Sequence, residues 1–159
     1  MGIIGKIRRT GRVAEPAPSR SERLPQAAGL AGSVQIRHVD AGSCNGCEIE
    51  IGQAFSPVYD AERFGLRLVA SPRHADVLTV TGPVTVNMVD ALRATHEAMA
   101  EPRLVVAVGD CARDGGVFSG SYAVLGGVGA RIPVDLHIPG CPPSPTALLK
   151  GLLALLAKA

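Results

Sequence analysis

The sequence has no tryptophan, and it has only two tyrosines and three phenylalanines among its 159 residues. A surface that stacks nucleic-acid bases needs aromatic side chains interleaved with basic ones, so this composition argues against a nucleic-acid partner. Hydrophobic residues nevertheless make up 47% of the chain. We therefore expect one domain with a sizeable core built mainly from Val, Leu, Ile and Ala.

Long hydrophobic runs are also missing. No segment approaches the ~20 apolar residues of a membrane-spanning helix, and the most apolar stretch, residues 147–157, contains Lys150. The first residues, Met1 to Lys6, lack the continuous apolar segment of a secretory signal. We therefore expect a protein that stays in a reducing cytoplasm and is held at a membrane only by partner subunits.

Positive charge is concentrated in residues 1–32. This segment contains six Lys or Arg residues against Glu15 and Glu22, whereas the whole chain has a net charge of +2. Its prolines and small residues predict a basic, flexible leader with little structure of its own. The leader is either a solvated tail or an arm that orders on a partner subunit or beside anionic lipid. Residues 33–159 are predicted to form a single domain.

Strand-like and helix-like patterns alternate through this domain. Apolar runs predict strands at 34–39, 66–70, 77–81, 104–108 and 134–138. Helical spacing predicts helices at 48–59, 87–100 and 146–158, with a break or kink at Pro57 near the end of the first. The glycine-rich segment 115–129 is predicted to be a loop with one helical turn. This alternation predicts an α/β fold with a parallel sheet and right-handed crossovers.

Cysteine is scarce, and its positions are informative. The chain has four cysteines: Cys44 and Cys47 in a Cys-Asn-Gly-Cys motif, and Cys111 and Cys141 alone in turns rich in glycine or proline. Each position follows a predicted strand, and ligands of parallel sheets lie at the carboxyl ends of the strands. We therefore expect three loops to bring four thiols to one sheet edge, where a reducing compartment favours metal binding over disulfides.

Thiolate ligands suit zinc or an iron–sulfur cluster. Structural zinc usually takes two close pairs of ligands, whereas a cubane cluster is wider and accepts ligands from dispersed loops. One pair and two single cysteines favour one [4Fe–4S] cluster; zinc and inert or redox-active thiols remain as alternatives. The adjacent Gly46, Gly109 and Gly140 would let the backbone approach the sulfides, or they are ordinary turn residues.

Five segments resemble the small subunit of membrane-bound, energy-converting nickel–iron hydrogenases of the formate hydrogenlyase and hydrogenase-4 type. They occur in the same order with matching gaps, at residues 42–51, 56–65, 71–76, 109–118 and 138–143. This family is related to the small, quinone-side subunit of respiratory complex I, in which the first two ligands are adjacent cysteines. The presence of Asn45-Gly46 between Cys44 and Cys47 is the hydrogenase arrangement and favours hydrogen chemistry.

The resemblance implies a flavodoxin-like open sheet with helices on both faces and the cluster in loops at its carboxyl edge. By the same resemblance, the four cysteines hold a [4Fe–4S] cluster close to the nickel–iron centre of a separate large subunit. Electrons then pass to a ferredoxin-like subunit during H2 evolution or oxidation, in a complex at the cytoplasmic face of the cell membrane. The chain would be a non-catalytic, electron-transfer subunit of this oxidoreductase.

Two other functions remain open. The first is a complex I-like module with the same cluster and no nickel site, which passes electrons to quinone or another acceptor. The second is an interaction domain stapled by zinc.

Two carboxylates follow the cysteine pair. Glu48 lies near the predicted helix start, where the helix dipole favours negative charge. Helix capping and charge balance are one interpretation of Glu48 and Glu50. The other is a proton path or a contact with the large subunit, for which we favour Glu50, because the resemblance matches it to a glutamate position shared across the family.

Overall fold

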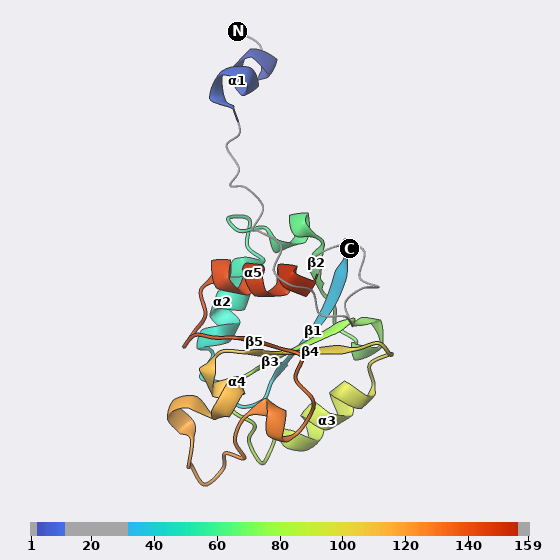
Figure 1. Ribbon diagram of the computed structural model, residues 1–159, viewed down its shortest axis with the longest axis vertical. Coiled ribbons are helices and arrows are strands. Elements are labelled where there is room, and N and C mark those ends of the chain that lie inside the picture. Colours follow the sequence, from blue (N-terminus) through green and yellow to red (C-terminus); the bar gives the residue numbers. More distant parts are fainter. Residues whose placement is uncertain (1–2, 12–31, 156–159) are drawn as a thin grey trace.

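The computed structural model describes residues 3–11 and 32–155. Five strands form one parallel sheet in the order β2-β1-β3-β4-β5 (Figure 1). They are β1 (Val34–Asp40), β2 (Leu66–Leu68), β3 (Val77–Thr81), β4 (Leu104–Val108) and β5 (Leu136–Ile138). This order is that of flavodoxin-like sheets, whose ligand crevice lies where the chain switches direction between β1 and β3. The predicted α/β fold class is confirmed.

Helices cover both faces of the sheet. They are α2 (Gly46–Ala54), α3 (Val89–Glu97), α4 (Asp110–Asp114) and α5 (Pro145–Leu155). Figure 1 shows α2 and α5 on one face and α3 and α4 on the other. Each face has its own core cluster, with Leu148 and Leu152 of α5 in one and Leu92 of α3 in the other. The domain is therefore a three-layer sandwich.

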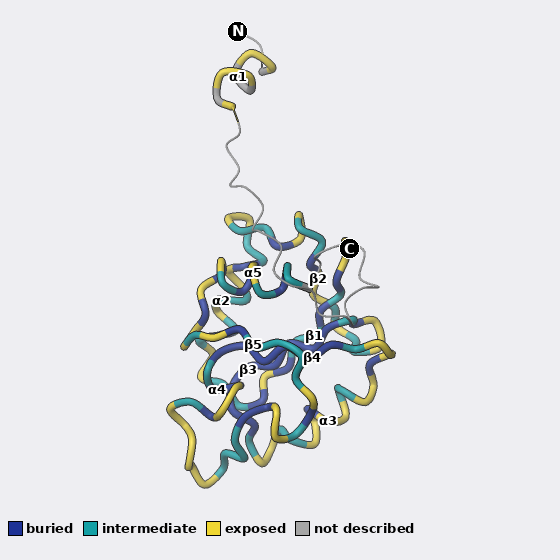
Figure 2. The backbone as a smooth tube through the Cα atoms, viewed as in Figure 1, coloured by how far each residue is buried: buried dark blue, intermediate teal, exposed yellow. Residues whose placement is uncertain are grey.

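The central strands are buried on both faces. Every residue of β3 and of β4 is buried (Figure 2). Successive side chains of a strand point to opposite faces, so Val77 packs in the α2/α5 core whereas Leu78 packs in the α3/α4 core. This confirms that the apolar run 104–108 is a strand without a solvent face, which fixes the carboxyl ends of β3 and β4 rigidly at the sheet edge.

Several predicted boundaries differ from the structure. The helix predicted at 48–59 with a break or kink at Pro57 ends earlier, because α2 stops at Ala54. Pro57 lacks a backbone donor and disfavours helical backbone at the residue before it. The strands predicted at 66–70 and 134–138 are also too long. Observed β2 and β5 have three residues each, since both are edge strands paired on one side only.

The glycine-rich segment is more structured than predicted. It contains two 3-10 turns, Gly116–Phe118 and Val128–Ala130, and Val124 pairs with Thr85 in an antiparallel bridge. Helix α4 (Asp110–Asp114), directly before this segment, was not predicted. Its five residues are too few to show a helical period in the sequence.

Part of the basic leader also has structure. Residues Ile3–Thr10 form helix α1, which differs from the expectation of little structure in residues 1–32. The rest of the leader, residues 12–31, lies outside the described residues, and the division into a leader and a domain stays a prediction. None of the helices in residues 3–11 and 32–155 is long and apolar enough to cross a membrane.

Candidate metal centre

Three loops at the carboxyl edge of the sheet bring the four thiols together. Cys44 and Cys47 lie in the loop after β1 and the first turn of α2, Cys111 is the second residue of α4 after β4, and Cys141 follows β5. All four line one cavity of about 90 Å³. This convergence follows from the parallel strand alignment, because each loop leaves the sheet at the same edge.

The four cysteines differ in exposure. Cys47 and Cys111 are buried, each with 8% of its surface exposed, whereas Cys44 and Cys141 are exposed. Burial, reinforced by the charge of Glu48, raises the pKa of Cys47 to about 12, and burial also raises the pKa of Cys111. Both thiols are therefore protonated at neutral pH without a metal. Metal binding must displace these protons, and cationic charge in the cavity must stabilise the thiolates.

The cavity suits a wide group better than a single ion. Within residues 3–11 and 32–155, no three His, Cys, Asp or Glu side chains are arranged to hold one metal ion. A zinc ion draws four sulfurs to about 2.3 Å from its centre and would leave no such space between them. A cavity of about 90 Å³ is several times the roughly 10–15 Å³ that one water molecule needs. Size and donor chemistry together fit an iron–sulfur cluster.

Gly109 and Gly140 are required by the backbone itself. Their φ values are +87° and +136°, a region that side chains rarely adopt. A Cβ on Gly109 would lie 2.8 Å from Sγ of Cys47, and one on Gly140 would lie 2.6 Å from Cα of Pro143. At Gly46 a Cβ would meet Sγ of Cys44 at an ordinary 3.6 Å. Positive φ and close contacts, with a thiol at Gly109 and with the Pro143 backbone at Gly140, therefore demand glycine at both positions. The predicted cofactor role of all three glycines stays a prediction.

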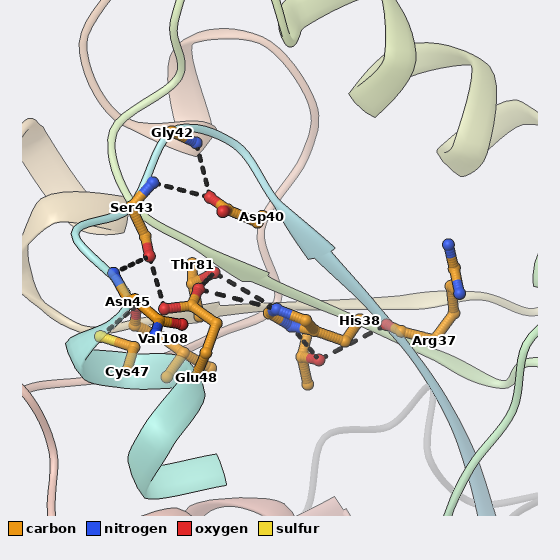
Figure 3. Close-up of polar contacts among 11 residues, drawn as sticks. Arg37, His38, Asp40, Gly42, Ser43, Asn45, Cys47, Glu48, Thr81 and Val108 are labelled. Carbon is orange, nitrogen blue, oxygen red and sulfur yellow. Dashed lines mark hydrogen bonds and ion pairs between the residues drawn. The ribbon is translucent and has the colours of Figure 1, made fainter. Parts of the chain in front are cut away.

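Hydrogen bonds from side chains hold the loop that contains Cys44 (Figure 3). The carboxylate of Asp40 accepts from the backbone N–H groups of Gly42 and Ser43 at 2.8 and 2.6 Å. The hydroxyl of Ser43 accepts from the N–H of Asn45 at 2.9 Å and donates to Glu48 at 2.5 Å. Sequence reasoning assigned no role at the site to the side chains of Asp40 and Ser43, although Asp and Ser side chains commonly hydrogen-bond to nearby backbone in turns.

Glu48 connects this loop to the sheet. The hydroxyl of Thr81 on β3 donates to one oxygen of Glu48, and Nε2 of His38 on β1 lies 3.7 Å from the same oxygen (Figure 3). Burial lowers the pKa of His38, although the nearby Glu48 opposes this effect. The side chain of Glu48 is 19% exposed. It therefore links three elements directly beside Cys47, a structural role that the capping interpretation did not include.

Glu50, the favoured functional carboxylate, lies differently. It is half-buried on α2. Among the described residues it has no side-chain hydrogen bond or ion pair, unlike Glu48. The structure does not bring Glu50 into the hydrogen-bond network of the cysteine loop, and its role stays a prediction.

The loops of Cys111 and Cys141 are joined by hydrogen bonds. The N–H of Gly109 donates to the carbonyl of Ile138 at 2.8 Å, and the N–H of Asp110 donates to the carbonyl of Gly140 at 2.9 Å. In return, the N–H of Gly140 donates to the Asp110 carboxylate at 3.3 Å. These bonds extend the β4–β5 pairing beyond the strands and set the relative positions of two cysteines that lie far apart in the sequence.

A comparison with protein families identifies the family of this chain. The model of the family described as NADH ubiquinone oxidoreductase, 20 Kd subunit, matches residues 44–155, which begin with the first cysteine and include the other three. The chain belongs to this family. The predicted relationship to the small subunit of complex I is thereby confirmed.

Two curated proteins are similar to this chain over most of its length. It is 49% identical over 123 residues to the probable membrane-bound hydrogenase subunit mbhJ of Pyrococcus furiosus, covering 77% of this chain and 74% of the relative. It is 51% identical over 120 residues to formate hydrogenlyase subunit 7 of Escherichia coli, covering 75% of this chain and 47% of that protein. The chain thus spans about half the length of the second relative. Its relatives are subunits of oxidoreductase complexes, as predicted.

Solved structures agree on the fold. A chain of the archaeal membrane-bound sulfane sulfur reductase, a respiratory membrane complex, matches with a TM-score of 0.71 and 33% identity, covering 82% of this chain and 72% of that chain. A chain of an NAD+-reducing [NiFe]-hydrogenase matches with a TM-score of 0.62 and 20% identity, covering 80% of this chain and 93% of that chain. The second match supports the fold alone.

Proposed function

We propose that this chain is the electron-transfer subunit of a multisubunit, membrane-associated [NiFe] hydrogenase. In this proposal Cys44, Cys47, Cys111 and Cys141 hold one [4Fe–4S] cluster. The observation that carries it is the convergence of four thiols on one cavity, in a chain about half identical to two subunits named for hydrogenase and formate hydrogenlyase.

The chain's own residues have distinct roles in this proposal. A bound [4Fe–4S] cluster supplies reversible one-electron transfer. The buried Cys47 and Cys111 anchor it to the rigid ends of the sheet, while the exposed Cys44 and Cys141 lie on the side open to a partner. The hydrogen bonds of Asp40, Ser43 and Glu48 keep the first cysteine loop in place.

The proposed partner beside this centre is the large subunit that carries the nickel–iron site. Several large apolar side chains are exposed on the segments that flank the cysteines: Ile49, Val117, Phe118 and Tyr122. Exposed apolar side chains that form a contiguous patch are typical of protein interfaces, and in this proposal these four belong to one. A ferredoxin-like subunit would take the electrons onward, and membrane subunits would hold the complex at the cytoplasmic face of the cell membrane.

A second candidate function has one specific observation in its favour. The chain is also 33% identical to a chain of a sulfane sulfur reductase complex. A complex I-like module with the same cluster, no nickel site, and quinone or another acceptor is therefore the alternative.

The cluster is tested by iron and acid-labile sulfide analysis and by EPR of the reduced protein. We expect about four irons and four sulfides per chain, and loss of the intact four-iron cluster in Cys111→Ser. The matched control is Ser121→Ala, an exposed residue of the adjacent glycine-rich segment, which should retain full iron. One zinc ion per chain without sulfide would contradict the cluster and would favour an interaction domain stabilised by zinc.

The partner is tested on the complex purified through this chain. Nickel in the purified complex, together with H2-dependent reduction of the EPR signal, is the expected result. A complex that contains the iron–sulfur signal but no nickel, and that is reduced by its own donor instead of H2, would favour the quinone or other-acceptor module.

A further inference from the structure

Helix α1 segregates apolar and basic positions around its axis. At about 3.6 residues per turn, positions 3, 4 and 7, all isoleucine, fall on one side. Positions 6, 8 and 9 are Lys, Arg and Arg and lie on the remaining arc together with Gly5 and Thr10. Arg8 borders the apolar side directly, and Lys6 comes after Thr10 at the other border. Residues 4, 5, 8 and 9 of this helix are exposed (Figure 2). Ile4 is 67% exposed.

This helix needs a surface to cover its apolar side. It has eight residues, fewer than the ~12–15 at which isolated helices become even marginally stable in water. Within the described residues, Arg8 and Arg9 take part in no ion pair. A short amphipathic helix of this kind gains stability when a surface covers its apolar side.

The charge of the segment indicates the chemistry of that surface. Positions 3–11 include Lys6, Arg8 and Arg9 and no acidic residue, and Arg12 follows directly. The positive charge of the whole leader, noted above, has the same sign. Isoleucines bordered by Lys and Arg are typical of helices that lie in the interface of an anionic bilayer, because the long cationic side chains reach the phosphates while their stems stay with the apolar groups.

We propose that α1 binds the surface of an anionic lipid bilayer, with its isoleucine side at the boundary of headgroups and acyl chains. In the sequence, positions 12–31 separate α1 from the rest of the described chain. At about 3.6 Å per residue, such a segment spans up to about 70 Å. Lipid binding by α1 therefore does not dictate how the domain docks on its partner subunits, and it does not require the metal centre.

The test is flotation of the full-length chain with vesicles. Phosphatidylcholine vesicles are compared with vesicles that also contain phosphatidylglycerol, at low and at physiological salt. We expect at least roughly tenfold stronger binding to the anionic vesicles, weakened by salt, and a gain of helical circular dichroism on binding. Equal binding to both kinds of vesicle would overturn the proposal.

Two double variants distinguish lipid binding by α1 from non-specific attraction through the positive charge of the whole leader. R8Q/R9Q should lower binding to anionic vesicles by about 25-fold, because each cation near such a surface contributes about fivefold. R20Q/R23Q removes the same charge outside α1 and should lower binding by less than about threefold. Equal losses in the two variants would overturn the proposal. Ile4→Ser should also weaken binding, and an unchanged thermal unfolding transition in the absence of vesicles serves as the folding control for every variant.

The competing occupant is a protein subunit. Tryptic cleavage after Arg8 and Arg9 is followed for the complex in anionic vesicles and in detergent. Protection in vesicles and cleavage in detergent supports lipid binding. Protection in lipid-free detergent, with no binding of the isolated chain to vesicles, assigns α1 to a partner subunit and overturns the proposal. None of these readouts depends on nickel or hydrogenase activity, so the proposed function can fail independently.

Discussion

Burial gives the thiol of Cys47 a pKa of about 12 in the folded chain, against an ordinary value of 9.0. A group whose pKa is raised by folding contributes stability below its unfolded pKa and loses that contribution as pH rises toward its folded pKa. The metal-free fold is therefore weakened by alkali in the window from about 9 to 12.

At the scale of this residue, we expect the free energy of unfolding of the metal-free, reduced chain to fall by about 1 kcal/mol between pH 8 and pH 10 because of Cys47. Urea unfolding at both pH values, compared between the wild type and Cys47→Ala, isolates the effect. The variant should show a smaller fall; its residual fall would come in part from Cys111, whose pKa is also raised. Identical falls in both proteins would contradict this prediction.

Glu48 gives a second prediction at the residue scale. Glu48→Ala leaves the hydroxyls of Ser43 and Thr81 without their acceptor and should lower the free energy of unfolding by about 1–3 kcal/mol. Glu48→Gln keeps an acceptor oxygen and should lose less. Thermal and urea unfolding measure both.

The control for Glu48 is Glu50→Ala on the same helix. Because Glu50 has no polar partner within the described residues, its removal should change stability by less than about 0.5 kcal/mol. A loss from Glu50→Ala as large as that from Glu48→Ala would show that the hydrogen-bond network does not carry the effect.

At the residue scale, the sequence predicted the residues with distinctive local chemistry, but it did not predict side-chain contacts between distant segments. The four cysteines and the glycines beside them stand out because their residue types are rare or conformationally special. Glu48, by contrast, contacts Thr81 and His38 on two different strands. No local pattern marks such a contact, because it depends on how β1, β3 and α2 pack.

At the scale of elements, replacing a helical glycine by alanine is expected to have opposite effects on stability in α2 and in α5. In α2, a Cβ on Gly52 would meet nothing within 4 Å, whereas in α5 a Cβ on Gly151 would lie 2.6 and 2.7 Å from two carbons of Ile138. Ile138 is 2% exposed, so α5 packs closely against β5 at this point. We therefore expect glycine-to-alanine substitution to raise the free energy of unfolding in α2 and to lower it in α5.

Gly52→Ala should stabilise the domain by about 0.5–1 kcal/mol, because alanine restricts the unfolded chain and favours helix. Gly151→Ala should destabilise it by about 1–3 kcal/mol, since overpacking against Ile138 outweighs the helix propensity. Denaturant unfolding of the two variants provides the comparison. Stabilisation by Gly151→Ala would mean that α5 and β5 separate at little cost.

Element boundaries were the weaker part of the sequence prediction. The type of each long element was right, because β-branched runs and helical spacing persist over several residues. The ends of β2 and β5 were wrong, since pairing with a neighbouring strand decides where a ladder stops. Helix α4 was missed for a related reason: so short a helix carries too little periodicity, and its position depends on the hydrogen bonds between the loops of Cys111 and Cys141.

At the scale of the whole molecule, the predicted division into a leader and a domain can be tested by truncation. The chain without residues 1–31 keeps Gly32. The carbonyl oxygen of Gly32 packs so closely against Gly65 that a Cβ on Gly65 would clash with it. We expect its free energy of unfolding to stay within about 0.5 kcal/mol of the full chain, with unchanged iron content. A loss above about 2 kcal/mol would assign part of the leader to the domain core.

The sequence by itself determined the four candidate thiols, the alternation of strands and helices, and the family, because these reside in residue types and in patterns along the chain. The sequence also predicted that three loops bring the four thiols to one sheet edge. Only the tertiary structure decided that the cavity between them is wider than a single ion needs. It also decided that Glu48 belongs to a hydrogen-bond network and Glu50 does not. The physical reason is that cavity size, thiol burial and polar partners arise where separate loops meet at a sheet edge, and no single segment contains that information.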